Sequence, residues 1–141
     1  MDDRNVKHLE MIQGVVKRLA GNSFTIKGWS ITLVSALFAL AAKDANERYV
    51  VIALFPAFCF WGLDAYYLWK ERLFRSLYDA VRTEADKPVD QRSVPPFSMN
   101  TGPVASRVDS WFGVLCSKTI VLLHVPIVAA VAAVYAYAIW K

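Results

Sequence analysis

Residues 49–69 read YVVIALFPAFCFWGLDAYYLW, a run that is apolar except for one acidic residue, Asp64. A helix needs about 20 mainly apolar residues to cross a bilayer, and this run is long enough. Asp64 is its only Asp, Glu, Lys or Arg, and such a charge costs a few kcal/mol at mid-bilayer on insertion scales. The run therefore predicts a membrane-spanning helix with one ionisable group that insertion does not require.

Two further segments, 22–43 and 118–140, have the length and apolarity of spanning helices. With 56% hydrophobic residues in a chain of 141, the polar remainder is too short and scattered to form a separate soluble core. The sequence therefore predicts an all-α integral membrane protein, a single domain over 1–141 with three transmembrane helices.

The first span carries Lys27 close to its start. Its long stem can lie along the helix while the ammonium group reaches the headgroups. We expect this span to begin at Asn22 or Ser23, which suit a helix N-cap after Gly21. Residues 1–21 would then form a separate cytosolic helix.

The positions of Lys and Arg predict the orientation, because positive charges in short flanking loops favour the cytoplasmic side. Thirteen of the 16 lie in segments 1–27 and 70–118, and three lie between the first two spans or at the C-terminus. We expect a bacterial cytoplasmic (inner) membrane protein with its N-terminus inside and its C-terminus outside. The net charge of +4 then reflects topology and attraction to anionic lipid, and no nucleic-acid partner is expected.

Two segments on the cytosolic side have the periodicity of amphipathic helices. The second span should continue without a break into the cytosol, as one helix over 49–82, because neither Gly nor Pro separates Trp69 from Lys70. The apolar positions of the two segments are Leu9, Ile12, Val16 and Leu19, and Leu73, Phe74, Leu77, Tyr78 and Val81. These positions are candidate contacts within one subunit, between subunits or with a cytosolic protein partner, and they also fit a helix lying on the membrane surface.

The polar side of the second segment carries Arg72, Arg75 and Arg82. This cytosolic basic face fits a phosphate or nucleotide ligand, but a solvated helix beside anionic lipid is the more ordinary explanation.

Residues 85–106 are rich in Pro, Ser, Asp and Asn, and their four prolines forbid a regular α-helix. A connection of this length is either mobile or functional. We expect a flexible linker, with docking of Pro95, Pro96 and Phe97 in an aromatic groove as the alternative. Residues 107–117 should follow as an interfacial helix.

Asp64 has two candidate partners in the membrane. Asp64 precedes Lys70 by six residues and His124 follows Lys118 by six, so both should lie at a similar depth on the cytoplasmic side. Lys27 enters from the same side. An intramembrane polar cluster of Asp64, His124 and Lys27 would relay protons or respond to pH. Alternatively, Asp64 bonds a Ser, Thr or Trp of a neighbouring helix and fixes subunit packing.

Motifs of catalysis are missing from the sequence. Cys59 and Cys116 lack metal-ligand spacing, and there is no phosphate loop, zinc signature or nucleophile elbow. We expect no catalytic residues, no metal and no cofactor, hence a protein that is not an enzyme.

The runs KGWSITLVSALFAL (27–40) and WGLDAYYLWKERLFRSLYDAVR (61–82) resemble small bacterial inner-membrane proteins of the RipA-like octameric type. They are more loosely similar to small transmembrane effectors found beside nucleotide-signalling antiphage systems. The resemblance covers roughly residues 7–82. It implies an architecture, a cytoplasmic-membrane location and homo-oligomerisation, with Asp64 and the 71–82 helix as subunit contacts or gate elements. It implies no activity.

The expected function is that of a homo-oligomeric inner-membrane scaffold or accessory component, whose partners are the lipid bilayer, further copies of itself and a cytosolic protein. The alternative is an oligomeric pore or membrane-disrupting effector, gated from the cytosolic side in an antiphage or stress response.

Overall fold

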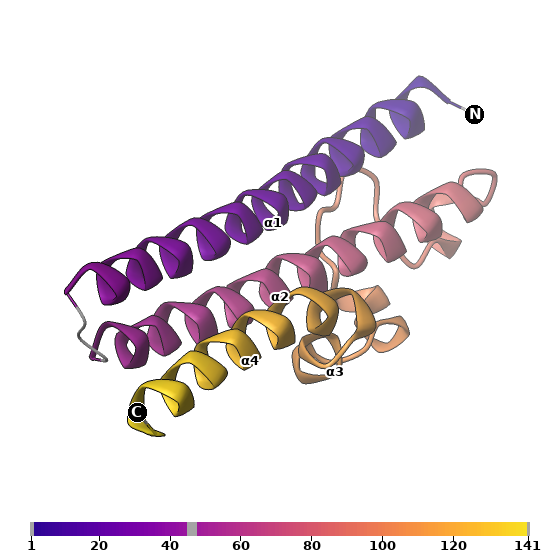
Figure 1. Cartoon of the computed structure of the whole chain (residues 1–141). Coiled ribbons are helices and arrows are strands. Elements are labelled where there is room, and N and C mark those ends of the chain that lie inside the picture. Colours follow the sequence, from indigo (N-terminus) through magenta and orange to yellow (C-terminus); the bar gives the residue numbers. More distant parts are fainter. Residues whose placement is uncertain (1, 45–47, 141) are drawn as a thin grey trace.

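The computed structural model describes residues 2–44 and 48–140, and within these ranges the chain is helical and has no strand. Three long helices lie side by side: α1 (Asp3–Asp44), α2 (Arg48–Thr83) and α4 (Lys118–Trp140). The connection from α2 to α4 contains two short 3-10 helices, η1 (Val89–Gln91) and η2 (Gly102–Arg107), and the one-turn helix α3 (Trp111–Leu115). In Figure 1, α2 runs antiparallel to both of the other long helices.

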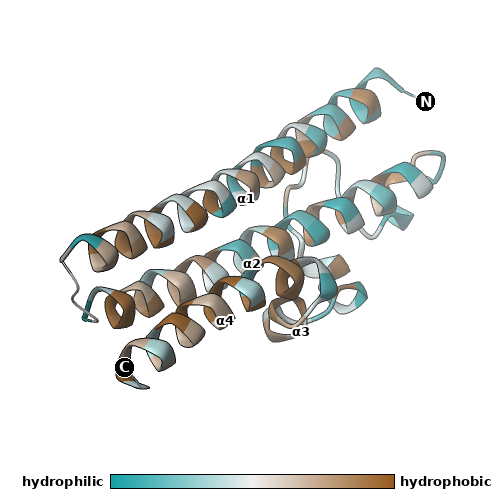
Figure 2. Cartoon of the chain, viewed as in Figure 1, coloured by the Kyte–Doolittle hydropathy of each residue, from teal (hydrophilic) through white to brown (hydrophobic). Residues whose placement is uncertain are grey.

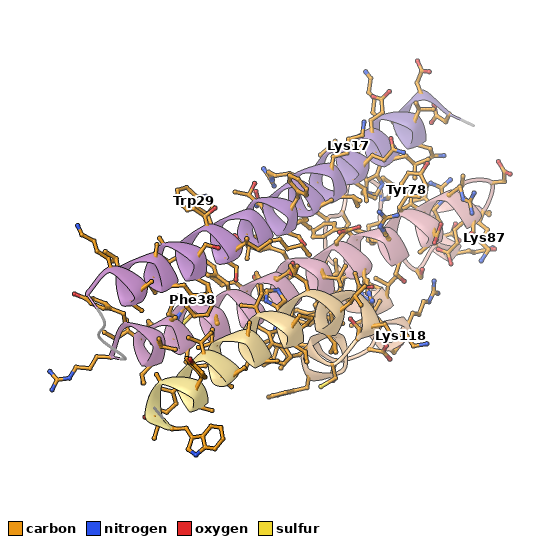
Figure 3. The ribbon with its side chains drawn as sticks, in the orientation of Figure 1. Lys17, Trp29, Phe38, Tyr78, Lys87 and Lys118 are labelled. Carbon is orange, nitrogen blue, oxygen red and sulfur yellow. The ribbon has the colours of Figure 1, made fainter. Side chains whose placement is uncertain are left out.

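All three long helices are long and apolar enough to cross a membrane, so this part of the predicted fold is confirmed. Figure 2 shows that hydrophobic residues dominate the end of the bundle near the C-terminus, while hydrophilic residues gather at the end near the N-terminus. Many large apolar side chains point outward. Trp29, for example, points away from the other helices and is 62% exposed (Figure 3).

Helix α1 corrects one expectation, because it runs without interruption from Asp3 to Asp44. The predicted new helix start at Asn22 or Ser23 is wrong. An isolated glycine such as Gly21 costs a helix only about 1 kcal/mol, and the Ser23 hydroxyl bonds the Asp64 side chain instead of the local backbone. Residues 3–44 therefore form a single element, in place of the two expected segments 1–21 and 22–43.

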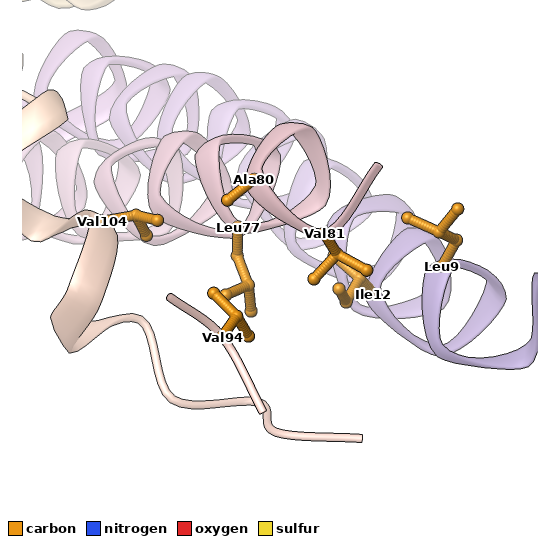
Figure 4. Packing of buried hydrophobic residues seen from close by; sticks show 7 residues of the cluster. All are labelled: Leu9, Ile12, Leu77, Ala80, Val81, Val94 and Val104. Carbon is orange, nitrogen blue, oxygen red and sulfur yellow. The ribbon is translucent and has the colours of Figure 1, made fainter. Parts of the chain in front are cut away.

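Helix α2 is also continuous from the apolar run into the polar segment, as the sequence predicts. Its polar half packs against the first half of α1 around Ile12 and Leu77, both of which are fully buried (Figure 4). The cluster consists of Leu9, Ile12, Leu77, Ala80, Val81, Val94 and Val104, with Val16, Phe74 and Tyr78 partly buried against it. The two predicted apolar stripes thus pack on each other within one chain.

Two of the predicted stripe residues lie outside this cluster. Leu73 is buried elsewhere along α2, and Leu19 is only partly buried. A second apolar cluster joins the other halves of the long helices, with Val34 of α1, Val50, Ala53 and Ala57 of α2, and Val131 of α4.

The segment between α2 and α4 corrects a further expectation. Residues 85–106 fold against the helices and do not form a loose linker, since Val94 and Val104 insert into the first apolar cluster. Arg92 reinforces this by donating to the side-chain oxygen of Asn5 at 3.0 Å and to the carbonyl of Ala85 at 2.7 Å. The prolines exclude a long helix, but tertiary contacts order the chain.

The interfacial helix predicted over 107–117 is also shorter than expected. Arg107 ends η2, Val108 is extended, and Ser110 caps α3 by accepting a hydrogen bond from the backbone of Gly113. Only Trp111–Leu115 is helical, because the extended residue and the cap separate this turn from η2.

Candidate functional site

Asp64 lies at the centre of a polar cluster between the three long helices, and its side chain is fully buried. One carboxylate oxygen, Oδ1, accepts hydrogen bonds from Ser23 Oγ at 2.5 Å and from Lys27 Nζ at 2.6 Å. The other oxygen, Oδ2, lies 2.9 Å from His124 Nε2. A single carboxylate therefore connects α1, α2 and α4.

The helical repeat explains how α1 contributes two of these groups. Ser23 and Lys27 are four residues apart, so their side chains lie on the same face of the helix. Lys27 Nζ also donates to Ser23 Oγ at 2.7 Å, while the hydroxyl hydrogen of Ser23 is directed to Asp64. The hydroxyl thus links the two charges, and every short contact in this triangle runs from a donor to an acceptor.

His124 is held by two kinds of contact. Its ring stacks on Trp61, with centroids 6.0 Å apart and planes 5° apart, and Trp61 is fixed in turn by donating Nε1–H to the Leu115 carbonyl at 3.2 Å. When Asp64 is ionised, the His124 Nε2 proton points at Oδ2, so the other nitrogen, Nδ1, is a bare acceptor. Nδ1 is buried and has no partner in the described part of the chain.

These contacts define what the cluster can do chemically. The negative charge of Asp64 is matched by Lys27, and pairing of this kind is what allows charges to exist in apolar surroundings. The His124 ring lies between this carboxylate and the face of the Trp61 indole. The arrangement ties the three long helices together.

The structure brings together all three residues of the predicted polar cluster, Asp64, His124 and Lys27. It adds Ser23, which is a serine of a neighbouring helix, as in the alternative prediction for Asp64, and is not the helix cap that the sequence predicts. The sequence signal that could have identified Ser23 is its position four residues before Lys27, because this spacing lets the two side chains form a hydrogen bond on one helix face.

The predicted basic face divides into two parts. Arg72 and Arg75 line a cavity of about 380 Å³ together with Arg107 from the end of η2. Arg82 lies outside this lining and faces Asp79 at 3.6 Å as an exposed pair, of a kind that contributes little to stability. Arg107, which the sequence analysis had not singled out, therefore joins the site in place of Arg82.

Among the residues that the structure describes, no group of three or more His, Cys, Asp or Glu side chains could hold a metal ion. Cys59 and Cys116 are free and exposed. Comparisons of the chain with models of protein families, with curated proteins and with solved structures found no match.

Proposed function

We propose that this chain is a three-span protein of the bacterial cytoplasmic membrane that acts as a homo-oligomeric scaffold or accessory component. The observation that carries the membrane part is the exposure of large apolar side chains on every long helix, including Phe24 on α1, Phe55 on α2 and Leu122 on α4, which are 76–80% exposed. Soluble monomers rarely expose large contiguous apolar surfaces, whereas lipid tails would cover them.

The distribution of charge supports the N-in, C-out orientation. The hydrophilic N-terminal end of α1, the polar end of α2 and the 85–110 segment lie at one end of the bundle (Figure 2). Lys43 and Arg48 belong to the other end. The end with more Lys and Arg is the one expected in the cytoplasm.

Two features of α4 support assembly. A mainly apolar cavity of about 320 Å³ lies between α4 and α1. Its lining includes Phe38 of α1 and Ile127 of α4. The alanines of α4 at positions 129, 130, 132, 133 and 136 are exposed. Small residues allow helices to approach closely in a membrane, so a neighbouring copy is the partner we propose for this face. This agrees with the resemblance to octameric RipA-like proteins.

The Asp64 carboxylate has all of its hydrogen-bond partners within its own chain, and this favours a scaffold over a pore. A carboxylate that lines an ion path faces water along that path, whereas this one is fully buried and has three side-chain partners on two other helices of its own chain. We therefore assign the Asp64 cluster a role in holding the three helices of one subunit together.

The test is the mass of the purified protein in mild detergent and in lipid nanodiscs. We expect a multimer of defined subunit number. Ala133→Phe on the exposed face of α4 should dissociate it, while the same enlargement at exposed Ala36 of α1 serves as the matched control. A wild-type monomer would refute assembly, and release of the chain from membranes by alkaline carbonate would refute insertion. Ion flux through liposomes that Asp64→Asn abolishes would replace the scaffold with a pore.

A further inference from the structure

Two open cavities follow one face of α2, and residues of the segment 107–115 border both of them. The first is the polar cavity of about 380 Å³ lined by Arg72, Arg107 and Asp109 among others. The second has a volume of about 270 Å³ and is lined by Phe58, Trp61, Gly62, Trp111 and Leu115. The structure thus places a charged cavity and an apolar cavity between the same two elements.

Helical spacing puts the two cavities in line along α2. Phe58 and Trp61 line the apolar cavity and Arg72 and Asp79 the polar one, and steps of three and four residues connect these positions on one face of a helix. Ten residues separate Gly62 from Arg72, which corresponds to about 15 Å. This is the order of length over which a phospholipid passes from acyl chain to headgroup.

The depth of the polar cavity fits a headgroup. If the apolar run of α2 ends at Trp69 at the edge of the hydrocarbon, Arg72 lies about 5 Å beyond it, within a headgroup layer about 5–8 Å thick on each side. This step rests on the proposed insertion in the membrane.

The charges of the polar cavity are of both signs. The guanidinium groups of Arg72 and Arg107 have neither an ion pair nor a hydrogen bond within the described ranges 2–44 and 48–140, whereas that of Arg75 is held by Glu71 at 2.7 Å. Two carboxylates, Asp79 and Asp109, line the same cavity. A phosphate would satisfy the two unpaired guanidinium groups, but a ligand carrying only negative charge would also face the carboxylates.

We propose that this site binds a phospholipid whose headgroup combines a phosphate with a primary ammonium, as phosphatidylethanolamine does. Arg72 and Arg107 bind the phosphate, Asp109 accepts hydrogen bonds from the ammonium, and the apolar cavity beside Trp61 and Trp111 holds the start of an acyl chain. A trimethylammonium headgroup has no N–H to donate, so phosphatidylcholine binds more weakly.

The experiment is native mass spectrometry of the full chain in detergent with an equal mixture of phosphatidylethanolamine, phosphatidylcholine and phosphatidylglycerol of identical acyl chains. We expect phosphatidylethanolamine to be retained about tenfold more than phosphatidylcholine, since a hydrogen bond to a charged group is worth about that factor. Arg72→Ala with Arg107→Ala should abolish the retention of all three lipids, because each of them carries the phosphate. Asp109→Asn should reduce retention to the phosphatidylcholine level.

Lys7→Ala with Arg18→Ala is the matched control, because it removes the same charge from exposed positions of α1 outside the cavity and should leave both the retention and the preference unchanged. Equal retention of the three lipids, or a preference for phosphatidylglycerol, would overturn the proposal. So would displacement of the lipid by millimolar soluble phosphoethanolamine, which would show that the acyl chain adds nothing. Carbonate extraction of the wild type tests insertion separately, so failure of the lipid site is distinguishable from failure of the membrane assignment.

Discussion

The Asp64 carboxylate lies 2.9 Å from His124 Nε2, although 60 residues separate the two in the chain. Both side chains are almost completely buried, and they belong to α2 and α4, which lie side by side over the first part of α2 (Figure 1). Because Oδ1 of the same carboxylate is bonded to α1, loss of one side chain removes polar contacts to two other helices. The stability of the bundle should therefore depend strongly on this position.

Asp64→Asn should destabilise the folded chain by about 3 kcal/mol, because breaking a buried ion pair leaves the other charge uncompensated. The affected charge is the ammonium of Lys27, whose side chain is only 26% exposed. Lys27→Met in the same chain should restore part of the loss by removing that charge. Unfolding in mixed micelles, followed by tryptophan fluorescence, of the wild type, of Asp64→Asn, of Lys27→Met and of the double variant gives the four free energies of a double-mutant cycle. A double variant no more stable than Asp64→Asn would show that the ion pair is not the source of the effect.

Leu77→Ala should cost about 2–5 kcal/mol, as large-to-small changes in a closely packed core do. Leu77 is fully buried in the cluster that joins α2 to α1 and to Val94 of the following segment (Figure 4). The matched control is Met11→Ala, because Met11 is 48% exposed on the same level of α1 and its removal should change the free energy of unfolding by less than about 0.5 kcal/mol. The same unfolding assay measures both. Similar losses for the two variants would contradict the packing in Figure 4.

The long apolar helices were predictable because their signal is local: the length and apolarity of such a helix are both properties of one continuous stretch of sequence. The continuity of α1 could not be predicted, because Gly21 and Asn22 carry the local signature of a helix boundary. The deciding contact comes from Asp64, 41 residues away from Ser23. A serine that is satisfied across helices no longer acts as a cap, and no local pattern reveals which of the two applies.

The polar cluster was predictable in part, since counting residues from the charged ends of two spans places Asp64 and His124 at one depth. The order of the 85–106 segment was not predictable. Its prolines exclude an α-helix, and this pattern is the same as that of a loose connection. The contacts that order the segment come from distant residues; His8, for example, contacts the carbonyl of Ser98, 90 residues away. Contacts over such separations leave no periodic trace in the sequence.

His8→Ala should loosen the 94–99 segment. His8 is buried, its Nε2 lies 2.9 Å from the Ser98 carbonyl, and its Nδ1 accepts the backbone N–H of Phe97. These two contacts hold Phe97 in the left-handed region, at φ 60°, where a bulky residue is unfavourable. We expect hydrogen exchange at residues 97–99 to accelerate about fivefold to tenfold, as the loss of about 1 kcal/mol implies.

Lys7→Ala is the control for this change, because Lys7 precedes His8 on α1 and is exposed. It should leave exchange in the 94–99 segment unchanged, and neither variant should affect α4. Unaltered exchange in His8→Ala would mean that Val94 and Arg92 hold the segment without the histidine.

Glu84 gives the start of the same segment a dependence on pH. Its Oε2 accepts hydrogen bonds from the backbone N–H of Ser93 at 2.7 Å and from the Ser93 hydroxyl at 2.9 Å. These bonds, the backbone bond foremost, lower the pKa of Glu84 from its ordinary value of 4.5. Because the folded pKa is the lower one, the stabilisation is fully present above the unfolded pKa and is lost as the pH falls through the folded pKa.

Exposure of the 85–93 segment to an acid-active protease should therefore increase below about pH 4.5, and Glu84→Gln should be cleaved equally at all pH values above and below this range. Ser93→Ala keeps the backbone bond and loses only the hydroxyl bond, so it should retain a weaker pH dependence. Asp90→Asn is the matched control, because Asp90 is an exposed carboxylate in η1, and it should behave as the wild type. If Glu84→Gln kept the wild-type pH profile, another group would have to be responsible for the acid sensitivity of this segment.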